Sequence, residues 1–243
     1  QMILQGRVTV NAIPAHLGQK IDLNIDQIAV DGCFVGTSDR PEKIYLLMNK
    51  PIGVVSTCRD PQGRQTVIDL LDPGLRHGKG IHPVGRLDVD STGALLLTND
   101  GDLTFLLTHP RHDVPKTYRV WVKGYPSEQT LNQWRQGVML DGRKTLPAEV
   151  SIIQQLPKQS TLLEVVLHEG RNRQIRRVAE QLGYPVLRLH RTAIGSISLK
   201  TEASDEISLG KYRALTDLEM SFLNSQINLI SEVEPAIGEE CNV

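Results

Sequence analysis

The sequence GRLDVDSTGALLLTNDG occupies residues 85–101 and combines charged, turn-forming and apolar residues. The apolar run 94–97 predicts a buried strand. Residues 91–93, Ser-Thr-Gly, predict a tight polar turn before it. Such a turn at the end of a buried strand can hold a carboxylate in one fixed position. We therefore expect Asp88 to be a reactive acid, with Asp90 close by.

Other interpretations of these carboxylates remain open. The segment DVDST, residues 88–92, fits the D-x-D-x-T signature of haloacid-dehalogenase-type phosphatases, in which the first Asp accepts a phosphoryl group and binds magnesium. In those enzymes an apolar strand precedes the signature, whereas here the strand follows it and residues 82–86 are polar. By itself, DVD favours two solvated Asp residues in a turn, and only the residues that follow argue against that interpretation.

Length and composition indicate an ordinary globular protein. A chain of 243 residues with 40% hydrophobic residues can bury at least one core and carry a small accessory unit. No apolar run approaches the roughly 20 residues that cross a bilayer, and no signal-peptide pattern opens the chain. Cys33, Cys58 and Cys241 lack C-x-x-C spacing, which favours reduced thiols over a disulfide or zinc site. We expect a cytoplasmic protein that does not bind membranes.

The net charge of −1 conceals an uneven distribution. Residues 111–213 carry 17 Lys or Arg against 10 Asp or Glu, a balance of +7, whereas residues 214–243 carry 6 acidic and no basic residues. A basic segment attracts a phosphate backbone, although such a segment can also be simply a solvated face.

The first 38 residues predict a small separate module. Residues 2–6 are typical of the last turn of a helix that ends at Gly6, and β-rich runs follow at 8–11 and 28–30. They resemble the second half of the alpha-L RNA-binding module, without the first helix and most of the second. We expect residues 1–38 to be a truncated alpha-L module that binds RNA weakly by itself. A plain β-hairpin is the alternative, and residues 37–43 are a credible linker.

The turn NKPIG, residues 49–53, joins two predicted strands. Pro51 fixes φ and lacks an amide donor, and Gly53 permits a tight return. Lys50 is either a phosphate contact or a solvated turn lysine. The elements predicted around this turn are strands at 45–48 and 54–57, a short helix at 66–71 and a loop at 72–80.

The later part of the chain contains an alternating strand, 116–122, and a helix at 172–182. Apolar residues of that helix share one face, while Arg173, Arg176 and Arg177 share another, so basic side chains are held on a buried helix. The loop 109–116 contains two His and one Asp, but two prolines leave no regular element to fix metal ligands, so we expect no metal site there. Further predicted helices are 102–107, 127–136 and one that starts at the capping box 216–219; further strands are 148–155, 161–168 (central in the sheet), 186–190 and 194–199.

Five motifs in this order resemble the RsuA-like family of ribosomal RNA pseudouridine synthases. They are N-K-P-x-G, G-R-L-D with S-T-G and T-N-D-G, K-T-Y, G-R-x-x-Q-I-R-R, and the closing L-x-R-x-x-I-G-x-x-x-L, and they span about 45–219. The resemblance implies an α+β fold with a mixed, mostly antiparallel sheet in two subdomains around a central cleft. It places the catalytic domain at 43–222. The acidic composition of residues 223–243 predicts a disordered tail. The implied activity is that of an isomerase acting on a uridine of large- or small-subunit ribosomal RNA.

The resemblance also implies roles for individual residues. Asp88 is the catalytic carboxylate, acting as nucleophile at C1′ or as base at C2′, and Arg176 pairs with it and keeps it ionised. Tyr118 stacks on the base, and Arg86 fills the vacancy left by the flipped nucleotide. We expect no cofactor or metal, a monomer, and ribosomal RNA as partner. The other residues expected to bind substrate are Lys50, Lys116, Arg173 and Arg177.

Two other functions remain as alternatives. A magnesium-dependent phosphatase would use Asp88 and Asp90, and a non-catalytic RNA-binding protein would use the basic segment alone.

Overall fold

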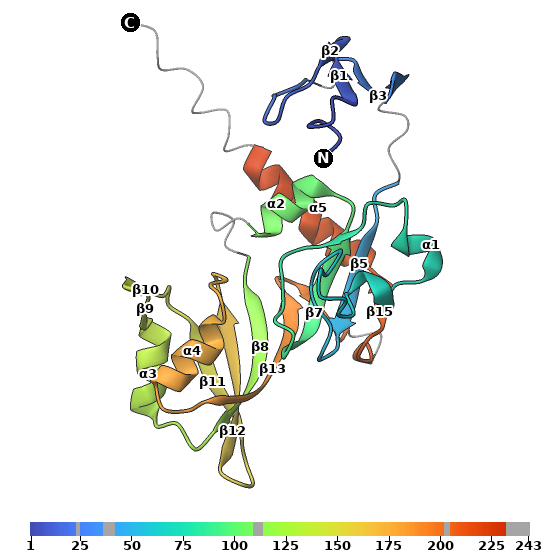
Figure 1. The fold of residues 1–243 in the computed structure, drawn as a ribbon. Coiled ribbons are helices and arrows are strands. Elements are labelled where there is room, and N and C mark those ends of the chain that lie inside the picture. Colours follow the sequence, from blue (N-terminus) through green and yellow to red (C-terminus); the bar gives the residue numbers. More distant parts are fainter. Residues whose placement is uncertain (23–24, 36–41, 109–113, 202–204, 232–243) are drawn as a thin grey trace, which may run out of the picture. The chain divides into compact units, whose positions relative to one another are not determined.

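The computed structural model describes residues 1–22, 25–35, 42–108, 114–201 and 205–231 (Figure 1). The chain divides into two compact units, Gln1–Glu42 and Lys43–Val243. The predicted boundary falls between residues 38 and 43, and most of the predicted linker lies outside the described residues. Among the described residues, no helix is long and apolar enough to span a membrane.

The first unit contains a small antiparallel sheet. Its strands pair in the order β2 (Ile13–Pro14), β1 (Val8–Val10), β3 (Ile28–Val30) and β4 (Cys33–Phe34). Hydrogen-bonded turns precede it and end at Gly6, whose φ is 68°. The predicted runs 8–11 and 28–30 are therefore strands, but they belong to a four-stranded sheet instead of a single hairpin.

The second unit is built on a nine-stranded sheet. Between the named strands of the described residues, the pairing of β13 with β7 is parallel and all the others are antiparallel. This is the mixed, mostly antiparallel sheet that the sequence predicted. The strand order is β11 (Glu149–Leu156), β12 (Ser160–Leu167), β8 (Lys116–Lys123), β13 (Val186–Ile194), β7 (Thr92–Thr98), β5 (Tyr45–Lys50) and β15 (Tyr212–Ala214), with β14 (Ile197–Ser198) on β13 and β6 (His82–Pro83) on β7.

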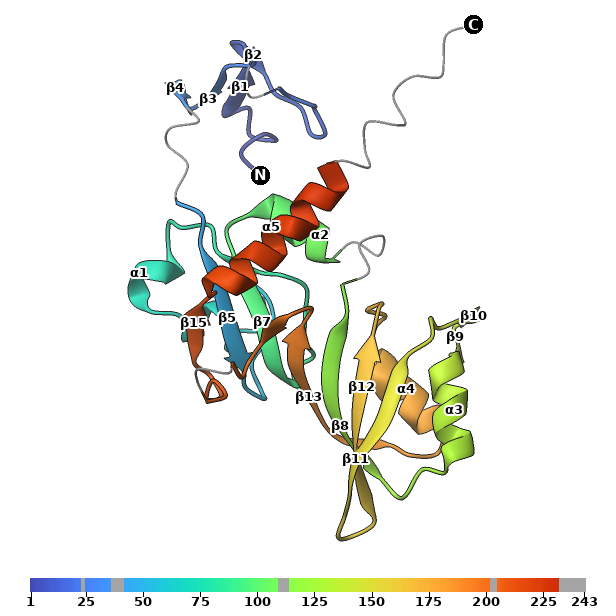
Figure 2. The same cartoon turned by 180° about the vertical axis from the view of Figure 1, so that it is seen from behind.

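Four helices of eight or more residues pack against this sheet. Helices α3 (Glu128–Gln136) and α4 (Gln174–Gln181) lie on one face of the half formed by β8, β11 and β12 (Figures 1 and 2). Helices α2 (Gly101–Thr108) and α5 (Asp217–Ser231) lie beside the other half. Shorter elements are the 3-10 helix η2 (Ile68–Leu70), helix α1 (Pro73–Arg76) and the hairpin of β9 (Met139–Leu140) and β10 (Arg143–Lys144).

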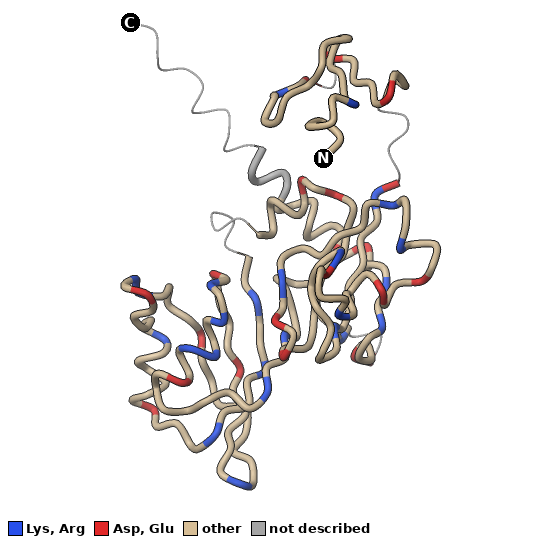
Figure 3. Tube along the Cα trace, viewed as in Figure 1, with Lys and Arg blue, Asp and Glu red and all other residues tan. Residues whose placement is uncertain are grey.

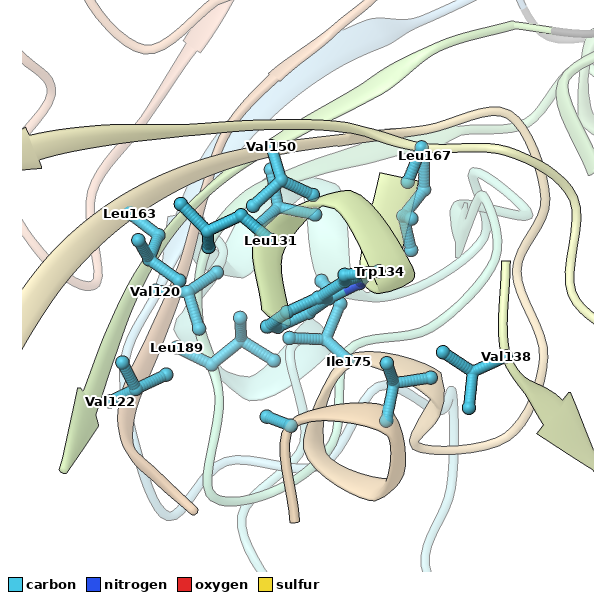
Figure 4. Close-up of a cluster of buried hydrophobic side chains, with 14 of the residues drawn as sticks. Val120, Val122, Leu131, Trp134, Val138, Val150, Leu163, Leu167, Ile175 and Leu189 are labelled. Carbon is cyan, nitrogen blue, oxygen red and sulfur yellow. The ribbon is translucent and has the colours of Figure 1, made fainter. Parts of the chain in front are cut away.

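Three clusters of buried side chains form the core of the second unit. The first lies between α3, α4 and their half of the sheet, and Trp134, Val120 and Ile175 belong to it (Figure 4). The second joins β5 and β7 to α2 and α5, and the third contains Leu87 and residues of β5 and β7. Tyr118 packs against both the first and the third cluster, so it lies where the two halves of the sheet meet.

Several predicted boundaries were wrong. Residues 54–57 form only an isolated bridge between Val55 and Thr66, and the helix predicted at 66–71 is the short η2. The predicted strands 186–190 and 194–199 are one continuous strand, β13, followed by β14, because β13 pairs with β8 along nearly its whole length. Strand β12 is interior but lies second from the edge, so it is not central.

The predicted capping box is confirmed. Thr216 N donates to Glu219 Oε2 at 2.9 Å, and Glu219 N donates to Thr216 Oγ1 at 3.3 Å. Helix α5 then continues to Ser231, and Leu223 is 1% exposed in the second cluster. The predicted boundary after residue 222 is therefore wrong, since it would cut a helix that the core holds. Residues 232–243 of the predicted tail lie outside the described residues.

Candidate active site

Four residues form a row across the sheet at the junction of its two halves. The register pairs Lys50 with Gly93, Gly93 with Arg191, and Arg191 with Tyr118. Paired residues on adjacent strands point to the same face, about 4.8 Å apart. The row therefore brings residues from four strands, far apart in sequence, to one face of the sheet beside the loop that carries Asp88.

Gly93 allows the parallel strands at this junction to approach closely. Its φ is 115°, and a Cβ there would lie 2.1 Å from the carbonyl oxygen of Arg191. The predicted turn at 91–93 was misplaced: the turn spans Asp88–Ser91, with Ser91 N donating to Asp88 O at 3.0 Å, and Gly93 lies inside β7. The glycine thus serves strand packing, and the turn forms immediately after the acid.

Asp88 lies in the loop before β7, where backbone hydrogen bonds fix the preceding residue and an arginine contacts its side chain. Leu87 is buried, and its backbone exchanges two hydrogen bonds with the Ser56 hydroxyl, at 3.0 and 3.2 Å. The side chain of Asp88 is 33% exposed, and its Oδ2 lies 3.2 Å from Arg173 Nη1. The backbone next to Asp88 is therefore fixed by hydrogen bonds, while the carboxylate is partly exposed to solvent and paired with a cation.

Arg173 bridges the two carboxylates of the motif. It donates to both oxygens of Asp90, at 3.2 and 3.0 Å, in addition to Asp88. The hydrogen bonds from Arg173 hold the pKa of Asp90 below its usual value, with help from the charge of Arg176. Arg173 is the N-cap residue of α4 and has left-handed backbone angles, φ 48° and ψ 32°, which direct it toward the loop. The sequence predicted Arg173 only as a substrate contact.

Arg176 contacts the turn and not the carboxylate of Asp88. Its Nη2 donates to the Asp90 carbonyl at 2.9 Å and to Ser91 Oγ at 3.3 Å, while its Nε lies 3.5 Å from Asp90 Oδ2. The predicted Asp88–Arg176 ion pair is absent among the described contacts, and Arg173 takes that position. Arg173 is the N-cap residue immediately before α4, whereas Arg176 lies in the first turn of the helix. The two guanidinium groups therefore reach different atoms of the loop.

Lys50 is fully buried, so neither interpretation offered for it was right. It has 0% exposure, and its Nζ donates to the carbonyls of Ser91 at 2.9 Å and Pro51 at 3.0 Å. Burial lowers its pKa to about 8, although the charges of Asp88 and Asp90 oppose that shift. Lys50 therefore joins the N-K-P-x-G turn to the loop that carries Asp88 from inside the protein, and its side chain is not exposed to a phosphate in this structure.

The other predicted site residues are spread more widely. Arg86 is exposed, two residues before Asp88, and Tyr118 is half-buried in the row across the sheet. Lys116 is half-buried at the start of β8. Arg177 donates to both oxygens of Asp141 in the β9–β10 turn, at 2.9 and 2.5 Å, so the structure does not join it to the group around Asp88.

Arg191 was not among the predicted site residues. It is 6% exposed, its Nε donates to the Ala94 carbonyl at 2.7 Å, and its Nη2 has no hydrogen-bond partner among the described residues. Its charge also helps to lower the pKa of Lys50. The sequence signal was an arginine within the largely apolar segment VLRLHRTAI, but only the register shows that it faces the site.

The same contacts argue against the phosphatase alternative. A guanidinium group from α4 occupies the space between Asp88 and Asp90, where that mechanism would need magnesium. The apolar strand also follows the carboxylates, as the sequence had suggested. Within the described part of the chain, no group of three or more His, Cys, Asp or Glu could hold a metal ion; most of the loop 109–116 lies outside it.

The site thus holds a partly exposed carboxylate beside a guanidinium group, and comparison with known proteins identifies the class of this chain. The family described as RNA pseudouridylate synthase matches residues 44–181. The chain belongs to that family, whose members are isomerases that act on RNA.

Particular relatives cover nearly the whole chain. Ribosomal large subunit pseudouridine synthase B of Bacillus subtilis is 37% identical over 93% of this chain and 88% of its own length. The Pseudomonas aeruginosa protein of the same name is 39% identical over 93% of this chain and 58% of its own length. A crystal structure titled pseudouridylate synthase superposes with a TM-score of 0.67 at 30% identity, covering 91% of this chain and 90% of that one.

Proposed function

We propose that this protein converts a uridine of large-subunit ribosomal RNA to pseudouridine, with Asp88 as the catalytic carboxylate. The names of the Bacillus subtilis and Pseudomonas aeruginosa relatives support this RNA as the substrate. The observation that carries the assignment of Asp88 is its ion pair with Arg173, which joins the loop before β7 to the start of α4. The family resemblance of G-R-L-D points to the same residue.

The reaction moves the uracil without changing its composition. The bond between N1 and C1′ breaks, the base rotates while it is held, and C5 forms a bond to C1′. The proton on C5 is lost and N1 gains one, so the atoms balance without an oxidant, reductant or co-substrate. Asp88 acts either as nucleophile at C1′ or as base at C2′, and a third of its side chain is open to receive the substrate.

Cations around the loop hold the two Asp carboxylates in position. Arg173 contacts both carboxylates, and Arg176 fixes the backbone of the turn that follows Asp88. A carboxylate that points at a guanidinium keeps its charge more easily when RNA excludes water from the site. Arg173 therefore takes the role that the sequence assigned to Arg176.

Tyr118 stacks on the target base, and Arg86 fills the space that the base leaves in the RNA. Tyr118 is packed between two core clusters, so its ring is a rigid surface against which a detached uracil can stack during rotation. Arg86 is exposed beside the catalytic loop, and its planar guanidinium can replace the flipped base in the RNA stack. Both roles accord with the extrusion of a nucleotide from folded RNA.

The test is Asp88→Asn, compared with wild type on transcripts of large- and small-subunit ribosomal RNA. We expect isomerisation by the variant to fall at least about 1,000-fold, because an amide cannot act as nucleophile or base. Retained RNA affinity, within about threefold in a filter-binding assay, would show that the fold is intact. Normal turnover by the variant would refute the assignment of Asp88, and modification of the small-subunit transcript alone would refute the proposed substrate.

A further inference from the structure

In the half of the sheet that α3 and α4 cover on one face, the opposite face carries a line of basic and aromatic side chains. Along β8, Val120 and Val122 point into the first core cluster, so Arg119, Trp121 and Lys123 alternate to the other face. Each of these three positions lies about 7 Å from the next along the strand. Figures 1 and 2 show α3 and α4 on one face of this half of the sheet, and neither helix covers the opposite face. The first core cluster, which contains Val120, joins the sheet to these helices, so Trp121 lies on the opposite face.

The neighbouring strand β13 extends this surface. Trp121 pairs with Arg188, whose guanidinium carbon lies 4.7 Å from the centre of the indole ring. Arg188 is exposed, so one face of its planar guanidinium lies over the ring, and the other face can receive a flat ligand. This stacked pair is held by two adjacent strands and is therefore preorganised.

A hollow of about 410 Å³ lies at the end of the surface nearest β14. Arg119, Lys200 and the hydroxyl residues Thr192, Ser198 and Thr201 line part of it. Glu206 also lines it, but its Oε1 lies 3.1 Å from Nε2 of the buried His190. The hollow thus combines two cations and three hydroxyl residues, groups that bind phosphate oxygens, with the single carboxylate of Glu206.

The charge changes sign toward the edge of the sheet. The hollow of about 290 Å³ between β11 and β12 is lined by Glu149 and Glu164, with Arg135 as its basic residue. Arg135 is already engaged by Glu128 and by the Val150 carbonyl. A polyanion on this face would therefore follow β8 and β13. Figure 3 shows Lys and Arg recurring along β8.

We propose that an open-face patch binds a single-stranded segment of the RNA that is being modified. This patch consists of Arg119, Trp121, Lys123, Arg188 and Lys200. The proposal rests on the proposed function for the identity of the partner. Basic side chains that follow a backbone, together with an aromatic platform, are the elements of single-strand recognition. The patch lies on the sheet face opposite α4, whose N-cap residue Arg173 contacts Asp88. The patch therefore binds a segment of the RNA that is distant from the target uridine.

The direct test uses Trp121 as a reporter. The chain has two tryptophans, and the other, Trp134, is 4% exposed in the core. In full-length Trp134→Phe protein, emission comes from Trp121 alone. Titration with a large-subunit ribosomal RNA transcript should quench this emission in step with binding measured by filter retention, because a base stacks on the Arg188–Trp121 pair. Saturated binding with unchanged emission would overturn the proposal.

The second test changes the charge of the patch in the full chain. Arg119→Ala, Lys123→Ala and Arg188→Ala combined should raise Kd for the transcript at least about tenfold at 0.1 M salt and flatten the slope of log K against log salt by about 2. The value of kcat at saturating RNA should not change, because these residues do not touch the reacting base. An unchanged Kd and slope would overturn the proposal.

Matched controls separate this proposal from the proposed function. Glu164→Gln, which removes an acid from the same face, should leave binding equal or tighter, and Arg188→Lys should retain most of the salt dependence. Weaker binding by Glu164→Gln, similar to that of the triple variant, would mean that the face is only structural and would overturn the proposal. Asp88→Asn should still quench Trp121 in the Trp134→Phe background, so failure of the catalytic assignment leaves this binding readout intact.

Discussion

At the scale of single residues, Lys50 links pH to stability. The folded state lowers its pKa from 10.5 to about 8 through burial. Between these two values the unfolded chain binds more protons than the folded chain, so the free energy of unfolding rises with pH in that window. Below about pH 8 both states are protonated, and the full cost of the buried charge remains.

The first prediction compares wild type with Lys50→Met. The difference in free energy of unfolding between them should shift in favour of wild type by about 2 kcal/mol from pH 7.5 to pH 9.5, because Lys50 loses its charge in the folded state. Urea denaturation at the two pH values measures it. Parallel changes in both proteins would show that Lys50 keeps an ordinary pKa.

The second prediction concerns the two arginines of α4. The Arg176 side chain is 14% exposed and binds the Asp90 carbonyl and Ser91, so Arg176→Ala should cost about 1 to 3 kcal/mol of stability along with activity. The Arg173 side chain is 42% exposed, so Arg173→Ala should lower stability by less than about 1 kcal/mol. The same substitution should reduce kcat at least tenfold.

Thermal denaturation and single-turnover isomerisation of the two variants decide this comparison. A conservative Arg173→Lys variant should recover part of kcat, because it keeps the charge beside Asp88. If Arg176→Ala alone lost activity while Arg173→Ala stayed normal, the pairing predicted from the sequence would be the functional one, and the arrangement in the free protein would not persist in the RNA complex.

At the scale of elements, α5 depends on the contacts at its first turn. Glu219 accepts hydrogen bonds from Thr216 and both terminal nitrogens of Arg213, at 2.6 and 2.7 Å for the latter. Burial raises the pKa of Glu219, but the hydrogen bonds from Arg213 and Thr216 outweigh it and leave the pKa below its usual value. The stability from this carboxylate is therefore present above pH 4.5 and is lost as the pH falls through the lowered pKa.

The third prediction is that Thr216→Ala costs about 1 kcal/mol of stability and Glu219→Gln at least as much at pH 7. The Glu219→Gln penalty should shrink on acidification toward pH 3, since wild type then loses the same charge. Ser221→Ala on the exposed side of α5 is the control and should change stability by less than about 0.5 kcal/mol. A penalty that stays constant with pH would contradict the role of the ionised carboxylate.

Elements were predictable where the local pattern is unambiguous. The Ser127 cap, the Gly137 end of α3 and the 216–219 box mark helix ends through backbone hydrogen bonds within a few residues. The same approach failed at 54–57 and at 186–199, because strand length depends on a partner strand. Strand β13 continues through the predicted break because β8 supplies its partner from residue 116 onward.

At the scale of the whole molecule, the parallel junction of β7 and β13 joins the two halves of the sheet. Two register pairs define it, and the buried His190 binds Thr92 Oγ1 at 2.8 Å on one side and Glu206 on the other. Burial lowers the pKa of His190, although Glu206 opposes that shift. Stability from the neutral imidazole is thus present above about pH 6.5 and is lost as the pH falls toward the lowered value.

The fourth prediction is that wild type loses more stability than His190→Gln between pH 7.5 and pH 5.5. A glutamine cannot gain a proton, so the variant lacks this contribution while all other groups titrate alike. Denaturant unfolding at both pH values measures the difference, with the exposed His77→Gln as control. Equal losses in wild type and His190→Gln would show that this histidine does not couple the junction to pH.

The sequence by itself, through the resemblance of five motifs to a known family, determined the class of enzyme and the mixed sheet, and it named Asp88 as the candidate acid. Caps and residue periodicity located the main helices, because these are local properties. Only the tertiary structure decided that Arg173 pairs with Asp88, that Lys50 is buried and that Arg191 faces the site. These facts depend on strand register and on where a helix begins, and both are fixed by packing between segments that are some 40 to 100 residues apart.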